Sequence, residues 1–409
     1  MSVCKLDMRK CSGCSACAMA CPRKCICMKQ NEEGFYYPYV NKENCNNCGL
    51  CEKSCPALVA DKKETVLSSY AAINKDELCR KESSSGGIFY LLAKRILDEN
   101  GTVFGAAMMD DCKKVCHIEV EREEELWRLR GSKYVQSEIG NIYVQVKERL
   151  NDQKKVLFSG TPCQIAGLKL YLRKEYENLL TVDVICHGVP SEKIWNRYVD
   201  YIEKKYHAKL KMVNFRYKQF SWQDFSMKRV DKYDREVVVS KNDDTYMKFF
   251  LRNYSLRESC YSCSCKENKY SDITLGDFWG IENIIPDMND GMGTSAIIVR
   301  TEKGKNFLKK VKDKLKYEMV SEEDIVSNNS AECKSVCRPI EREYFYQDLE
   351  QMSYDKMIKK YAPTSLKVRI RRIVKNSFTG KLVKIFQGRW GGETVNNSDY
   401  YVRYLIQNK

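Results

Sequence analysis

The sequence predicts a small α+β module at the N-terminus, a larger α/β domain with a mixed sheet, and a helical basic tail. Three observations point to this division. A four-cysteine run occurs twice within residues 11–56, helical and extended patterns alternate after residue 83, and basic side chains dominate the C-terminal end. Because 409 residues usually form more than one domain, we expect boundaries that give domains over 1–62, 63–345 and 346–409.

The N-terminal module contains two copies of one cysteine pattern, Cys-x2-Cys-x2-Cys-x3-Cys-Pro. This is the bacterial pattern for 4Fe-4S clusters, in which three close cysteines hold one cube of iron and sulfide and the fourth reaches the neighbouring cube. We therefore expect a ferredoxin-like dicluster module with crossed ligand sets. One set is Cys11, Cys14, Cys17 and Cys55, and the other is Cys45, Cys48, Cys51 and Cys21.

Between the two cysteine runs, residues 26–30 and 35–40 are apolar-rich and a turn sequence separates them, which predicts a β-hairpin beside the clusters. Cys25 and Cys27 lie on this hairpin, where we expect them to be small buried apolar residues rather than ligands. A pair of zinc sites is the alternative interpretation of the cysteines. Zinc, however, favours two Cys-x2-Cys pairs over a repeated four-cysteine run.

The 21 cysteines are grouped at ligand spacing and form too small a fraction of the chain for a disulfide scaffold, which predicts reduced thiolates in the cytoplasm. No apolar run approaches the ~18 residues that span a bilayer, and no signal-peptide core follows Met1. The net charge of +15 is concentrated between Lys359 and Lys409, which carry 12 basic and 2 acidic side chains. Since cluster-bound thiolates also add negative charge, we expect no nucleic-acid partner.

Helical and extended segments alternate through the larger domain, which predicts a sheet with helices on its faces. The expected helices cover residues 88–97, 138–150, 163–175 and 191–205. The expected strands of this part cover residues 102–109, 115–120, 155–158 and 179–186. Five later strands look more antiparallel, at residues 212–216, 225–230, 237–240, 273–276 and 295–300.

Two turns lie where a strand should meet a helix, which is where open α/β sheets bind ligands. In the first turn, Ser84, Ser85, Gly86 and Gly87 should present free backbone N–H groups that could hold the phosphates of a nucleotide cofactor. A helix cap without a ligand is the alternative interpretation. The second turn places Cys163 in the first turn of a helix, where the helix dipole is expected to lower its thiol pKa.

Cysteines of the larger domain could form one further site. Together, Cys163, Cys186, Cys260 and Cys263 would supply the four thiolates of a third cluster, with Cys265 as a spare candidate. Scattered structural cysteines are the alternative, because no local segment contains a complete ligand set.

The larger domain resembles the beta subunit of coenzyme F420-reducing hydrogenases and dehydrogenases, a family in which many members carry a dicluster ferredoxin module. The likeness runs in order from about residue 70 to about residue 310. The matching stretches are residues 84–89, 103–106, 131–137, 159–168, 186–191, 260–263 and 272–280.

The resemblance implies bound FAD, a third 4Fe-4S cluster beside it, and two-electron exchange with a deazaflavin or another small-molecule substrate. It implies that the third cluster is held by the four cysteines named above, and that His187 is a candidate proton donor near the flavin, with a structural histidine as the alternative. Look-alikes with long basic C-termini occur in polysaccharide gene neighbourhoods, so the deazaflavin substrate stays open. The flavin residues implied are Ser85, Gly86, Gly87, Lys133, Ser137 and Thr161, with Ser84 adjoining them.

The tail has apolar residues at helical spacing from Leu366 to Ile385, with most basic residues off that stripe. Such a helix could lie on an anionic membrane surface, or it could pack on the larger domain. We expect a cytoplasmic oxidoreductase, peripheral to the inner face of the membrane if the tail binds there, that exchanges electrons with a ferredoxin or another redox protein. The alternative is a non-catalytic electron-transfer subunit that docks on a partner enzyme.

Overall fold

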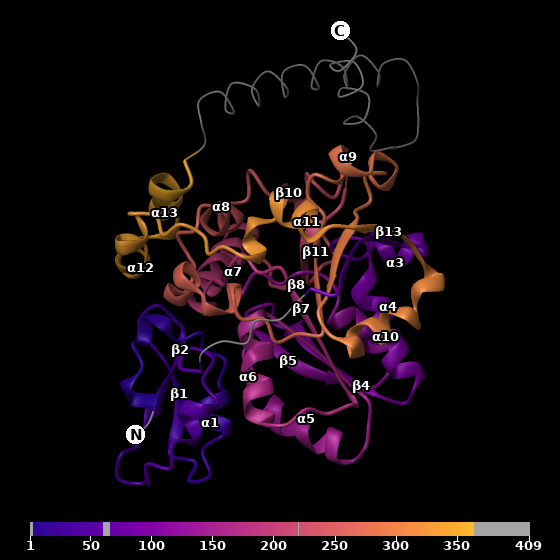
Figure 1. The fold of residues 1–409 in the computed structure, drawn as a ribbon. Coiled ribbons are helices and arrows are strands. Elements are labelled where there is room, and N and C mark those ends of the chain that lie inside the picture. The colour runs from indigo at the N-terminus through magenta and orange to yellow at the C-terminus, as the bar shows by residue number, and fades with distance from the viewer. Residues whose placement is uncertain (1–2, 60–65, 220, 364–409) are drawn as a thin grey trace, which may run out of the picture. The chain divides into compact units, whose positions relative to one another are not determined.

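The computed structural model describes residues 3–59, 66–219 and 221–363 (Figure 1). Residues 1–357 form one compact unit, which contains both the cysteine-rich module and the larger domain. The tail segment expected to form a basic amphipathic helix lies outside the described residues. Within the described ranges, no helix is both long and apolar enough to cross a membrane.

The N-terminal module consists of a hairpin and two short helices, coloured indigo in Figure 1. Strands β1 (Ile26–Gln30) and β2 (Tyr36–Val40) pair antiparallel, which confirms the predicted hairpin. Helices α1 (Ala16–Met19) and α2 (Leu50–Lys53) each carry the third cysteine of one run. Cys25 is buried as expected, but the expectation that Cys27 is buried is wrong, because its position in β1 faces solvent.

The larger domain is built on a mixed sheet of eight strands in the order β13-β3-β12-β11-β7-β6-β4-β5. The pairings β4 with β6, β6 with β7 and β7 with β11 are parallel, and the other neighbours are antiparallel. The strands are β3 (Ser68–Asn74), β4 (Thr102–Met108), β5 (Val115–Val120), β6 (Val156–Gly160), β7 (Leu179–Val184), β11 (Ile273–Asp277), β12 (Ser295–Val299) and β13 (Leu315–Val320).

The predicted mixed α/β class is confirmed, with several differences in detail. Strand β11 was expected among antiparallel strands, yet it pairs parallel to β7 on one side and antiparallel to β12 on the other. Helix α5 (Ile142–Asn151) begins later than expected, because Glu138 forms a bridge with Cys116 and Asn141 caps the helix.

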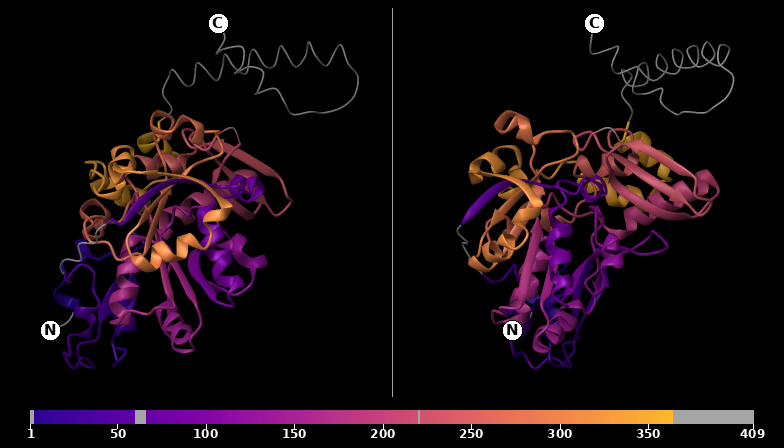
Figure 2. Two further views of the ribbon diagram at one scale, coloured as in Figure 1. Left: turned by 45° about the vertical axis from the view of Figure 1, so that its right-hand side comes forward. Right: turned by 90° about the vertical axis from the view of Figure 1, so that its right-hand side faces the viewer.

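Side chains that alternate along the strands divide the core between two faces of the sheet. Val103 and Leu157 face a cluster that contains Leu92 of α4 (Ile88–Asp98). Phe104 and Phe158, the next residue on each strand, face a cluster with α5 and α6 (Pro162–Leu172). Helices α4 and α10 (Glu302–Lys309) therefore cover one face, and α5 and α6 cover the other (Figure 2).

A second sheet of three antiparallel strands, in the order β10-β9-β8, follows α7 (Glu192–Tyr206). Its strands are β8 (Leu210–Tyr217), β9 (Ser226–Asp231) and β10 (Glu236–Ser240). Trp195 and Tyr198 of α7 pack against Phe215 and Tyr246 and fix α7 to this sheet. The remaining helices are α3 (Glu77–Lys81), α8 (Thr245–Leu251), α9 (Ile281–Ile284), α11 (Glu322–Asn328), α12 (Arg342–Gln351) and α13 (Tyr354–Tyr361).

Candidate iron–sulfur and cofactor sites

The first predicted ligand set is brought together inside the N-terminal module, where all four of its cysteines are buried. Burial raises the pKa of the Cys55 thiol to about 12, and the neighbouring thiols of Cys14 and Cys11 contribute to the rise. Burial also raises the pKa of Cys17, with contributions from Cys14, Cys11 and Cys55. Cys55 of the second run therefore lies among the cysteines of the first, as the crossed arrangement requires.

The second predicted set is more open to solvent. Cys48 is exposed, and Cys45 and Cys21 are partly exposed. The Cys21 Sγ lies 3.3 Å from the Cys25 Sγ. A hydrogen bond with Cys21 and burial raise the pKa of Cys25 to about 11, and Cys45 also contributes to the rise. Cys25, which sequence reasoning treated as a packing residue, thus lies beside two of the predicted ligands.

Among the described residues, no three His, Cys, Asp or Glu side chains are close enough to hold a single metal ion. A cube of four irons and four sulfides is larger than one ion and is held by thiolates spread around it. A set of cysteines can therefore hold a cluster if its members line the same environment. The residues Cys11, Cys17, Cys51 and Cys55 share one apolar cluster, and Cys21 and Cys45 lie at its margin.

The cysteines of the larger domain also converge, although they come from three separate segments. Cys163 lies in the first turn of α6, Cys186 follows β7, and Cys260 lies in the turn before β11. Burial raises the pKa of Cys260 to about 12, with contributions from Cys186 and Cys263. Because β6 and β7 are parallel, the start of α6 and the end of β7 lie at the same edge of the sheet.

The thiol pKa of Cys163 differs from the expected one. The prediction that the helix start lowers its thiol pKa is wrong, because burial raises that pKa well above the ordinary value and nearby Cys263 adds to the rise. The Cys163 Sγ lies 3.2 Å from the Thr161 Oγ1. The helix dipole does not outweigh the loss of solvent in this enclosed position.

Cys263 and Cys265 lie together at this site, and their thiol pKa values are shifted in opposite directions. A hydrogen bond from Cys265 lowers the pKa of Cys263 to about 6, and Lys266 and Lys269 help to lower it. The same hydrogen bond raises the pKa of Cys265. The Lys266 ammonium is buried and donates to the backbone oxygens of Cys186 and Ala331. The hydrogen bond between the two cysteines therefore favours a thiolate at Cys263 rather than at Cys265, and the charges of Lys266 and Lys269 add to this preference.

The first ligand set adjoins this third group of cysteines across α6. Cys14 shares a core cluster with Ile165 and Leu168, and Figure 1 shows α6 next to the N-terminal module. A Cβ atom placed on Gly167 would lie 3.0 Å from the Cys14 Sγ. Sequence reasoning missed Gly167, whose position after Ala166 on a helix was the only signal of a close approach.

The Ser/Gly turn before α4 was expected to offer free N–H groups, and this is wrong for Gly86. Its N–H donates to the Ser295 Oγ at 2.9 Å, because β12 runs directly beside the turn. The Ser85 Oγ donates to the Thr294 oxygen at 2.9 Å. The Ser84 Oγ lies 3.0 Å from the Ser132 Oγ and accepts from the Ser132 N–H at 2.8 Å. Gly87 begins the helix with φ +83°.

The other residues implied by the resemblance lie on loops outside this turn. Gln164 links two of them, because its Nε2 donates to the Ser137 Oγ at 2.9 Å and its Oε1 accepts from the Thr161 N–H at 2.9 Å. Lys133 is partly buried and donates to the Arg128 and Arg130 oxygens at 2.8 and 2.9 Å. Burial lowers the pKa of the Lys133 ammonium to about 7.

Lys218 is a further cation at the Ser/Gly turn that sequence reasoning missed. Its Nζ donates to the backbone oxygens of Arg80, Ser85 and Met292 at 2.7, 3.0 and 2.7 Å. Burial lowers the pKa of Lys218 to about 7, and the charge of Arg80 contributes. Because Lys218 is 133 residues from Ser85 in the chain, no local pattern could connect them.

His187 follows Cys186 and is mostly buried. Its Nε2 lies 2.7 Å from the Asn253 Oδ1, and its ring meets that of Phe250 edge-on. Burial lowers the pKa of His187. In the described part of the chain its hydrogen bond and ring contact are with these two residues and not with the predicted flavin residues.

Comparisons with known proteins agree with the cysteine pattern and the resemblance. Residues 10–59 match a 4Fe-4S dicluster domain, and residues 153–325 match the family described as the C-terminal part of the beta subunit of coenzyme F420 hydrogenase/dehydrogenase. A curated relative, the coenzyme F420-dependent sulfite reductase of Methanocaldococcus jannaschii, is 26% identical over 268 residues. That alignment covers 64% of this chain but only 39% of the relative.

A chain of the F420-reducing [NiFe] hydrogenase complex from Methanosarcina barkeri aligns with a TM-score of 0.45 and 16% identity, over 74% of this chain and 94% of that chain. The sequence resemblance and the family match lead to the same assignment. The protein therefore combines a segment that matches a 4Fe-4S dicluster domain with a later segment that matches the C-terminal part of the coenzyme F420 hydrogenase/dehydrogenase beta subunit.

Proposed function

We propose that the protein is an iron–sulfur flavoprotein oxidoreductase that passes electrons between a ferredoxin-type partner and a two-electron substrate. The proposal includes three 4Fe-4S clusters and one FAD. The observation that carries it is the convergence of Cys163, Cys186, Cys260 and Cys263, which lie beside one another at one edge of the sheet with Cys14 of the first ligand set close by.

The arrangement of the cysteines suggests a path for single electrons. The exposed second set could receive an electron from a partner, and the buried first set would pass it across α6 to the third set. Reversed flow would use the same path. A bound flavin would supply storage for one electron until the second arrives, which chemistry on a two-electron substrate needs.

The residues proposed to hold FAD include the Ser/Gly turn, and two cations that lack an ion-pair partner among the described residues support an anionic ligand. Within residues 3–59, 66–219 and 221–363, neither Lys133 nor Lys218 has a carboxylate within ion-pair distance, and both donate only to neutral backbone oxygens. A diphosphate near these ammonium groups would supply the missing negative charge. Ser85, Gly87 and Thr161 would line the same site, and His187 is proposed as a proton donor.

Anaerobic purification followed by iron, sulfide and flavin quantification tests this proposal. Three four-iron clusters and one flavin site predict about twelve irons and about one FAD per chain. About eight irons without flavin would favour an electron-transfer subunit that docks on a partner enzyme. A colourless, iron-free preparation would contradict both functions.

Two cysteine variants test the third site directly. Cys163→Ser should remove roughly a third of the iron, since one of three four-iron clusters would be lost. Cys333→Ser is the matched control, because Cys333 is exposed and lies outside the three proposed sets. Unchanged iron in Cys163→Ser would remove the third cluster from the proposal.

A further inference from the structure

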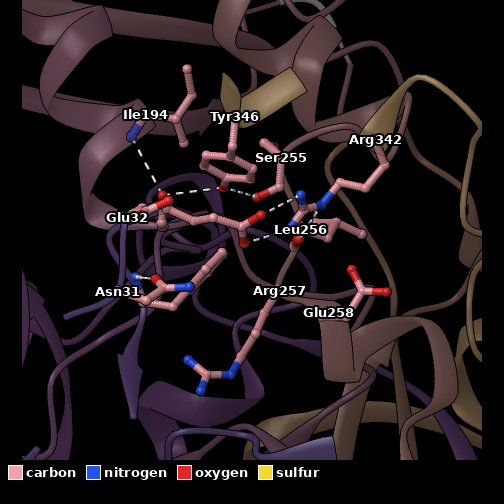
Figure 3. Close-up of polar contacts among 12 residues, drawn as sticks. Asn31, Glu32, Ile194, Ser255, Leu256, Arg257, Glu258, Arg342 and Tyr346 are labelled. Carbon is pink, nitrogen blue, oxygen red and sulfur yellow. Dashed lines mark hydrogen bonds and ion pairs between the residues drawn. The ribbon is translucent and has the colours of Figure 1, made fainter. Parts of the chain in front are cut away.

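Two buried arginines connect the N-terminal module to the larger domain, and Figure 3 shows their side chains extending in different directions. The Arg257 Nε donates to the Cys11 oxygen at 2.6 Å, and its Nη2 donates to the Tyr36 oxygen at 2.9 Å. Its Nη1 donates to the Gln136 Oε1 at 3.1 Å. Arg257 therefore contacts the first cysteine run, the hairpin and a loop of the larger domain at once.

Arg342 is the second of these arginines, and its charge is neutralised locally. Its Nη1 and Nη2 donate to the two carboxylate oxygens of Glu33, both at 2.7 Å, and its Nε donates to the Leu256 oxygen at 3.0 Å. Glu33 lies in the turn of the hairpin, so this ion pair joins the module to α12. Removing both members of the pair would leave the net charge of the contact unchanged.

Arg257 has no such partner. Its guanidinium lies 4.2 Å from the ring centroid of Tyr37 and 5.3 Å from that of Phe35, and in the part of the chain that the structure describes no carboxylate reaches it. The side chain is fully buried. Hydrogen bonds and ring faces satisfy its donors but do not cancel its charge, and burying an uncompensated charge is costly.

The groups that could compensate this charge are the proposed cluster ligands on its two sides. Arg257 contacts Cys11 and lies at the start of the turn that carries Cys260. The Cys260 N–H donates to the Arg257 backbone oxygen at 2.9 Å, so Arg257 is hydrogen-bonded to a proposed ligand of each cluster. A Cβ atom on Gly13 would lie 2.8 Å from the Arg257 Nη1, so the first run leaves room for the guanidinium.

We propose that Arg257 is a positioning residue whose fixed positive charge raises the reduction potentials of both the first and the third cluster. The inference rests on the proposed function, because it requires clusters at both sites. Reduction adds negative charge to an anionic cluster, and a nearby buried cation stabilises the reduced form. A charge that shifts both potentials in the same direction leaves the energy step between the two clusters little changed.

The experiment is an anaerobic redox titration of the full-length protein, followed by electron paramagnetic resonance. Arg257→Gln removes the charge and keeps hydrogen-bonding capacity, whereas Arg257→Lys keeps the charge. We expect Arg257→Gln to move the midpoint potentials of the first and third clusters to more negative values and to leave the second cluster nearly unchanged. Arg257→Lys should stay close to the unmodified protein.

The matched docking control is the double variant Glu33→Gln, Arg342→Met, which removes an interface contact without changing net charge. Its midpoint potentials should not shift. The third-site signal is assigned by its loss in Cys186→Ser, and the second-site signal by its loss in Cys48→Ser.

Three outcomes would overturn the inference: unshifted midpoints in Arg257→Gln with all clusters present, equal shifts in Arg257→Gln and the docking control, or equal loss of clusters from Arg257→Gln and Arg257→Lys. Loss of clusters from Arg257→Gln alone would support a requirement for the charge. A missing third-site signal in the unmodified protein would instead contradict the proposed function.

Discussion

The two cysteine runs have the same spacing but different surroundings. Cys11, Cys14 and Cys17 of the first run are buried, and Cys14 packs against α6. In the second run Cys48 is exposed, and Cys45 is partly exposed. The repeat thus gives two equivalent ligand patterns, and tertiary packing makes them unequal: the second is more open to solvent, and the first faces the larger domain.

The largest expected effect comes from removing the proposed third cluster, which follows the first cluster on the proposed electron path. Cys186→Ser should remove roughly a third of the iron, and flavin reduction by reduced ferredoxin should fall to background. Reduction of the remaining two clusters should persist, because their ligands lie in the module. Stopped-flow absorbance measures both processes. Normal flavin reduction in this variant would mean that electrons bypass the third set.

The difference in exposure predicts an order of oxidative damage. On titration with ferricyanide, the second cluster should be lost first, so an early phase should release roughly a third of the iron. The first cluster should follow later because its cysteines are buried. Iron release and the remaining resonance signals measure the order. Simultaneous loss of both clusters would contradict the unequal surroundings.

Gly167→Ala tests the contact between Cys14 and α6, which distinguishes the first cysteine run from the second. In a helix interior this change normally stabilises a protein by about 0.5–1 kcal/mol. Here the added methyl would lie 3.0 Å from the Cys14 Sγ and 3.1 Å from the Tyr143 hydroxyl, so we expect a loss of about 1–3 kcal/mol in the free energy of unfolding. Anaerobic denaturant unfolding gives the sign, and a stabilised variant would refute the close contact.

The last prediction concerns the residues proposed to hold the flavin, which touch neither cysteine run. Lys133 and Lys218 have pKa values lowered to about 7 by burial, so both are protonated below pH 7 and lose their charge as the pH rises. FAD affinity should be constant below that pH and then fall, by up to about tenfold per pH unit for each lysine. Fluorescence titration from pH 6 to 9 measures this.

Lys133→Met should weaken FAD binding at pH 6 and flatten its pH dependence. Cys48→Ser, which alters only the second run, should leave the pH dependence unchanged and serves as the control. An affinity that increases between pH 7 and 9 would rule out these lysines as the groups that hold the cofactor.

Local patterns predicted much of this molecule from sequence. The cysteine spacing, the hairpin at residues 26–40 and the alternation from α4 to α7 depend on neighbouring residues, and they agree with the structure. Arg257, Gly167 and Lys218 could not be found in this way, because their contacts join segments that are far apart in the chain. Two local predictions were wrong for a related reason. The Gly86 N–H is not free because the turn packs against β12, and the pKa of Cys163 is not lowered because the thiol is buried.

Strand β3 follows the module in the chain, but it lies between β12 and β13 in the sheet. Its partners are residues 295–299 and 315–320, so on the ribosome β3 must wait until most of the chain has been made. The dicluster module, complete by residue 59, has all eight of its cysteines available far earlier. Cluster insertion can therefore begin on a nascent chain whose larger domain is still open, before the cysteines proposed for a third cluster have been synthesised.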